Sequence, residues 1–111
     1  MIQPLGLIRV PLAGVPIRVT SVLPNPLDRY ACHGVMFQAL PTNAGRIYIG
    51  MSGMNKATFA QMLAFLAIPT ANVIPSYSAA LTLSPAAVHL HEMFVDVDQN
   101  NDGVIVSVLI T

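Results

Sequence analysis

The chain has 111 residues, which is enough for one domain and too few for two. Apolar residues make up 54% of the chain and charged residues only 9%, whereas a soluble domain usually carries about 25% charged residues. So little charge is typical of a protein whose surface is largely covered by partners. The formal net charge is zero and the five basic residues are scattered, which argues against nucleic acid as a partner.

The apolar content does not indicate a membrane protein. The longest nearly apolar run, residues 59–68, is well short of the roughly 20 residues that a spanning helix needs. No basic residue precedes Arg9, so the start of the chain does not match a secretory signal. A single cysteine, Cys32, excludes an internal disulfide and a cysteine-only zinc site.

In chain order, residues 1–16 are rich in Pro and Gly, and we predict an N-terminal arm with room for one edge strand. The domain then spans residues 17–111, beginning with a strand at Ile17. Period-two alternation predicts further strands over 31–40 and 46–51. Residues 41–45, PTNAG, contain turn formers, so we expect these two strands to form a hairpin.

The period then changes, and we predict a short α-helix over 59–67. Thr58 and Gln61 have the spacing of a capping box, and Pro69 ends the segment. Both faces of this helix are apolar, so both must be buried. One face can pack on the domain's own sheet, and the other needs a second chain; the alternative is that the domain's own loops enclose the helix.

Strands are expected again over 80–83, 90–97 and 104–110. The last strand is apolar on both faces, which indicates a central position in a sheet or a covering partner. Together these elements predict an all-β fold, a single β-sandwich of jelly-roll or Ig-like type with one short α-helix.

Residues 98–105, DQNNDGVI, match the first eight positions of a calcium loop, with Asp98, Asn100 and Asp102 as candidate ligands and Asp96 nearby. However, Leu109 occupies the twelfth position, where a bidentate glutamate is needed. The favoured interpretation is therefore a hairpin turn between two strands, without a metal. A weak calcium site in this turn remains the alternative.

Two other groups of residues have side chains that could carry chemistry. His89 and His91 share one face of a strand and could bind zinc or copper, but no third ligand is visible. Cys32 and His33 are adjacent in a strand and so point to opposite faces. We therefore predict structural roles for these residues, no cofactor, no catalytic residue and no small-molecule substrate.

Charge is unevenly distributed along the chain. The basic residues are Arg9, Arg18, Arg29, Arg46 and Lys56, whereas Glu92, Asp96, Asp98 and Asp102 lie near the C-terminus. Two interpretations stay open. The asymmetry is chance in a weakly charged chain, or it fixes the register of head-to-tail contacts between copies.

Two segments resemble small structural proteins of tailed bacteriophages. Residues 36–50, MFQALPTNAGRIYIG, are similar to their apolar strand with "QALPxNxG" followed by "IYVG", and residues 94–106, FVDVDQNNDGVIV, are similar to their closing hairpin "YVDxDxxGEGVxV". With the strand near 17–22, the resemblance covers about two thirds of the chain. The segment 56–68 departs from the shorter members, which have a polar loop there. The resemblance implies a virion protein without catalytic residues.

We therefore expect a non-enzymatic capsid decoration (cement) protein in the virion, with a neck, tail or head-fibre component, or a carbohydrate- or host-binding module, as alternatives. The expected partners are further copies of the chain, in a trimer, and the major capsid protein. The residues expected at the interface are Phe59, Met62, Leu63, Phe65, Leu66, Ile105 and Leu109.

Overall fold

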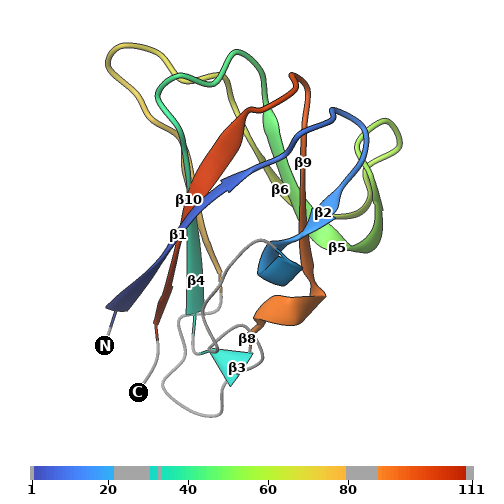
Figure 1. Ribbon diagram of the computed structural model, residues 1–111, viewed down its shortest axis with the longest axis vertical. Helices are drawn as coiled ribbons and strands as arrows, with labels where there is room; N and C mark the ends of the chain where they lie inside the picture. The colour runs from blue at the N-terminus through green and yellow to red at the C-terminus, as the bar shows by residue number, and fades with distance from the viewer. Residues whose placement is uncertain (1, 22–30, 33, 80–87, 110–111) are drawn as a thin grey trace.

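The computed structural model describes residues 2–21, 31–32, 34–79 and 88–109, which form an all-β fold of two four-stranded antiparallel sheets and one short two-stranded sheet (Figure 1). The strands are β1 (Ile2–Arg9), β2 (Ile17–Arg18), β3 (Ala31–Cys32), β4 (Gly34–Ala39), β5 (Ile47–Asn55), β6 (Ala60–Leu66), β7 (Ser76–Ala79), β8 (Val88–His89), β9 (Met93–Val97) and β10 (Gly103–Leu109). Short 3-10 turns lie at Val19–Ser21 and Leu90–Glu92, and the described residues contain no α-helix.

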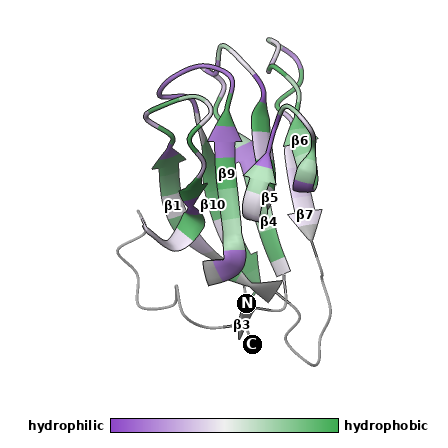
Figure 2. Cartoon of the chain, turned by 90° about the vertical axis from the view of Figure 1, so that its right-hand side faces the viewer, coloured by the Kyte–Doolittle hydropathy of each residue, from purple (hydrophilic) through white to green (hydrophobic). Residues whose placement is uncertain are grey.

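The two large sheets share one hydrophobic core. The first sheet has the order β1-β10-β4-β7 and the second has the order β2-β9-β5-β6, while β3 pairs with β8. Alternate residues share a face, as the alternation in the sequence predicted for β4, β5 and β10, and one face of each strand points into the core. Fully buried side chains at the centre include Phe37, Ile47, Ile49, Val95 and Val106. Figure 2 shows hydrophobic colouring along most of the strands, with hydrophilic residues gathered in the loops at the end opposite the termini.

Both predicted hairpins are wrong. β4 pairs with β10 and β7 in the first sheet, whereas β5 pairs with β6 and β9 in the second. β9 and β10 likewise belong to different sheets. The loops at 40–46 and 98–102 therefore carry the chain across the core from one sheet to the other. Turn-forming residues indicate that the chain reverses, but they do not say whether the next strand joins the same sheet.

The predicted helix over 59–67 is also wrong, because residues 60–66 form β6. This strand pairs with β5, with Tyr48 opposite Phe65 and Ile49 opposite Ala64. Phe59 and Gln61 have φ angles of 60° and 52°, which a right-handed helix does not allow. Tertiary pairing has overridden helix propensity over a segment too short to form a stable helix alone.

The predicted N-terminal arm is largely part of the domain. β1 pairs with β10 from Ile2 to Arg9, which makes it the edge strand for which the prediction left room. Only residues 10–16 form a link between β1 and β2. The strand predicted over 80–83 lies outside the described residues.

The β5–β6 hairpin folds back over the outer face of the second sheet. Between the pairs Gly50–Met62 and Asn55–Ala60, residues 51–54 of β5 lie opposite the single residue 61 of β6. This irregular bulge, with four residues opposite one, lets Met54 cover Gly50, and the Met54 side chain is only 6% exposed. A Cβ at Gly50 would collide with the carbonyl oxygen of Gln61. We call residues 51–61 the flap.

Candidate functional site

The loop with the calcium-like motif lies at the end of the molecule opposite the termini (Figure 1), where hydrogen bonds join it to the loop at 40–46 and to the link between β1 and β2. Asp102 is 7% exposed, and its carboxylate accepts hydrogen bonds from the N–H of Ala44 at 3.0 Å and of Gly45 at 2.8 Å. The side chain of Asn43 donates to the carbonyl of Gly103 at 2.9 Å and accepts from its N–H at 3.0 Å. These bonds hold the two sheet-crossing loops together.

The other oxygens of the motif bind the link between β1 and β2. Asn100 Oδ1 accepts from the N–H of Ala13 at 2.8 Å. Asp96 Oδ1 accepts from the N–H of Gly14 at 2.9 Å and of Val97 at 2.7 Å. Asp102 therefore serves the 41–45 turn, whereas Asn100 and Asp96 both serve the link between β1 and β2, because N–H groups in loops need acceptors.

This arrangement gives the motif a structural role that does not require a cation. Gly103 is needed because a Cβ there would collide with the carbonyl oxygen of Ile8 on β1. Asn101 takes a left-handed φ of 69°, which asparagine tolerates. Among the residues that the structure describes, no three His, Cys, Asp or Glu side chains are grouped so that they could hold a metal ion.

The structure also changes the meaning of the charge asymmetry. Asp96 and Asp102 are buried and bonded to backbone groups, so they are not available to a neighbouring copy. By contrast, Arg9, Arg18 and Arg46 are exposed. The head-to-tail charge interpretation is therefore not supported for these two acids, whose position in the sequence reflects their use inside the fold.

Asp98 belongs to a second cluster, under the flap. It accepts hydrogen bonds from the Tyr48 hydroxyl at 3.0 Å and from Lys56 Nζ at 3.2 Å. Lys56 also donates to the carbonyl of Val97 at 2.6 Å, which fastens the flap to the second sheet. Burial, followed by the hydrogen bond to Asp98, raises the pKa of Tyr48 above its usual value of 10.0.

The flap and β6 carry most of the residues predicted to lie in an interface. Phe59, Leu63 and Phe65 are 57%, 45% and 50% exposed, and Met62 is half-buried. The rings of Phe59 and Phe65 are 6.4 Å apart, and Arg46 lies 5.5 Å over the Phe65 ring. The prediction for Leu66 is wrong, because this side chain is in the core with 3% exposure.

The other predicted interface residues lie on the outer face of the first sheet. Ile105 is 39% exposed and Leu109 is half-buried. The register places them among uncharged residues on all four strands, in three rows. We call this surface the uncharged face, and it consists of Pro4, Leu7, Gly34, Met36, Gln38, Ser76, Ser78, Ile105, Ser107 and Leu109.

Sequence reasoning missed Leu7 and Met36, which are 48% and 40% exposed on this face. Leu7 fell in the predicted arm, where no face could be assigned. Met36 was placed on the face of its strand opposite Phe37, but nothing in the sequence showed that this face is bare.

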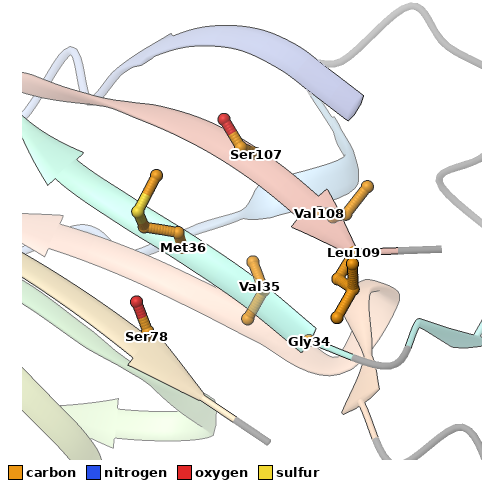
Figure 3. A pocket seen from close by; sticks show the side chains of 7 residues that line it. All are labelled: Gly34, Val35, Met36, Ser78, Ser107, Val108 and Leu109. Carbon is orange, nitrogen blue, oxygen red and sulfur yellow. The ribbon is translucent and has the colours of Figure 1, made fainter. Parts of the chain in front are cut away.

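A shallow hollow of about 190 Å³ opens in the uncharged face (Figure 3). Met36, Ser78, Ser107 and Leu109 line it from β4, β7 and β10. Gly34 contributes no side chain, and Val35 and Val108 point into the core. The hollow is almost entirely apolar and has no charged residue in its lining.

His33 lies outside the described residues, as do the side chains of Cys32, His89 and His91. In the described ranges, no helix has the length and apolarity needed to cross a membrane. No family model, curated protein or solved structure matches the chain.

Proposed function

We propose that the protein is a non-enzymatic structural subunit of a tailed-phage virion, most simply a capsid decoration protein with a β-sandwich fold. Its action is passive, because it stabilises a shell by packing against further copies and the major capsid protein. The observation that carries this proposal is the uncharged face, where Leu7, Met36 and Ile105 lie exposed together. Exposed apolar surface of this kind marks an interaction site.

The size of the uncharged face fits a subunit held by several contacts. Four strands about 4.8 Å apart and three rows about 6.7 Å apart give a projected area of about 400 Å². A standard stable interface buries about 800 Å² on each partner. The face alone is about half of that, so the proposal requires a second contact, for which the exposed aromatics Phe59 of the flap and Phe65 of β6 are available.

The sandwich assignment is supported by the connections. The chain passes between the two sheets from β1 to β2, β4 to β5, β6 to β7 and β9 to β10. Such repeated crossing over one shared core is the arrangement of a sandwich rather than of two separate sheets. The virion assignment is supported by the resemblance of residues 36–50 and 94–106.

Two measurements test the function. Light scattering of the purified chain, with and without a chelator, should show an oligomer that the chelator does not change. Particles purified from the organism that carries the gene should contain the chain in many copies by immunoblot. A chain that is absent from such particles would refute the virion assignment, whichever mass it has in solution.

A carbohydrate- or host-binding module is the second candidate, favoured by the exposed pair Phe59 and Phe65. However, Tyr48 is buried and its hydroxyl is bonded to Asp98, so this surface offers rings without tyrosine hydroxyls. Specific retention of the chain on a glycan array, abolished in a Phe65→Ala variant, would favour this candidate over the structural one.

A further inference from the structure

The flap presents an aromatic side chain in a fixed position. Phe59 lies at the tip of the β5–β6 hairpin with a left-handed φ of 60° and is 57% exposed. Asn55 Oδ1 accepts from the N–H of Ala57 at 2.8 Å, and Thr58 Oγ1 accepts from the N–H of Ala60 at 3.4 Å, so side chains hold both sides of the tip. Lys56 fastens the same tip to the second sheet.

The hollow offers a place of matching size on the opposite side of the molecule. A dry, apolar cavity of about 150 Å³ is known to hold a benzene molecule, so a hollow of about 190 Å³ can receive a phenyl ring. Its rim of Met36, Ser78 and Leu109 has no charge that burial would desolvate. The ring of Phe59 is likewise uncharged.

Phe59 cannot reach the hollow of its own chain. The flap lies on the outer face of the second sheet, whereas the hollow opens on the outer face of the first sheet, between β4 and β10. Resting on the function proposed above, we propose that Phe59 of one copy inserts into the hollow of a second copy. The contact joins two different surfaces, so it is heterologous, and each copy offers both halves of it.

A heterologous contact repeats from copy to copy. It closes into a ring if the rotation between copies allows, and otherwise extends as a filament. A two-fold dimer is not produced, because a two-fold contact needs the same surface on both partners. This distinction makes the proposal testable with two complementary variants.

The experiment uses one variant for each half of the contact. Phe59→Ser removes the ring, with Val73→Ser, 61% exposed and outside the flap, as its matched control. Met36→Glu places a charge in the hollow, with Leu12→Glu, at a side chain that is 57% exposed in the link between β1 and β2, as its control. Circular dichroism and thermal unfolding establish that all four variants are folded.

Light scattering then gives the mass of each chain alone and of equimolar mixtures. We expect the wild type and both controls to form the same oligomer, and each half-contact variant to be a monomer, with association weakened at least about 30-fold. A mixture of the two variants retains one intact contact, between wild-type Phe59 and a wild-type hollow, and should stop at a dimer of one chain of each kind.

Other outcomes overturn the proposal. A wild-type oligomer that persists in both variants means that the copies meet elsewhere, and this leaves the structural function standing. Variants that are monomeric alone but do not combine on mixing show that Phe59 and the hollow are not each other's partners. If Met36→Glu is unstable, Ser78→Trp fills the hollow from the edge strand β7 without adding charge, and the same outcomes apply to it.

Discussion

Replacing Asp102 with alanine is the sharpest test of the role assigned to the calcium-like loop. The substitution leaves the N–H groups of Ala44 and Gly45 without their acceptor. A buried donor left unbonded costs about 1–3 kcal/mol, and this applies in full to Gly45, which is buried, and less to Ala44, which is exposed. We therefore expect the free energy of unfolding to fall by about 3 kcal/mol. In a domain of this size, that loss lowers Tm by about 12 °C.

The matched control is Asp98→Ala, in the same loop. Its side chain is 36% exposed and its ion pair with Lys56 is at the surface, where such pairs are worth about 0–1 kcal/mol. Loss of the hydrogen bond from Tyr48 adds a comparable amount, so we expect about 1–2 kcal/mol. Urea unfolding followed by circular dichroism, with calcium and with chelator, measures both variants.

A calcium loop would behave differently. Asp98 and Asp102 would be ligands of the same ion, so their loss would cost similar amounts, and only when calcium is present. Equal losses in the two variants, or a rise in wild-type Tm on addition of calcium, would refute the structural role argued here.

Three further predictions concern the fold. Gly103→Ala should lower the free energy of unfolding by more than about 3 kcal/mol, because the added Cβ forces β1 away from β10. Gly14→Ala, at a φ of 87° with no atom near the added Cβ, should lower it by only about 1 kcal/mol, and urea unfolding distinguishes the two variants. Leu66→Ala should cost about 3 kcal/mol and Leu63→Ala under about 1 kcal/mol in the same assay, since only Leu66 is in the core, and similar losses would contradict the strand assignment. Because the pKa of Tyr48 is raised, the native state holds the phenol proton more tightly than the unfolded state does. The stability that this contributes is full below pH 10.0 and is lost as the pH rises toward the native pKa. The free energy of unfolding of the wild type should therefore drop more steeply above pH 10.0 than that of Tyr48→Phe, and parallel curves would contradict this.

The faces of the strands could be predicted from the sequence because alternation is a local property. Val35 and Phe37 follow one another at period two, and burial of one fixes the burial of the other. The same reasoning predicted that Ile105 would need covering, and the structure leaves it 39% exposed on a bare face.

The pairing of strands could not be predicted in this way, because it depends on contacts between distant segments. The turn at 41–45 has the composition of a hairpin loop, but Asp102 and Asn43 tie it to a loop almost 60 residues away. The segment 59–67 consists of good helix formers, and only its pairing with β5 makes it a strand. The calcium-like motif misleads for the same reason, since its oxygens serve N–H groups that the sequence does not show to be near.

The placement of the acids leads to a last prediction, on what drives association. Asp96 and Asp102 are buried and accept hydrogen bonds from backbone N–H groups. The two surfaces proposed to meet, Phe59 and the hollow, are uncharged. Association should therefore persist when NaCl is raised from about 0.05 M to about 0.5 M, a change that screens exposed charges beyond a few ångströms. Sulfate should strengthen it, because this salt favours burial of apolar surface. Sedimentation velocity across both salts measures the effect, with Arg46→Ser as the control for the cation nearest the aromatic pair. An oligomer that dissociates in NaCl would show that charge holds the copies together, and the partner of that charge would then have to be an acid other than the two buried ones.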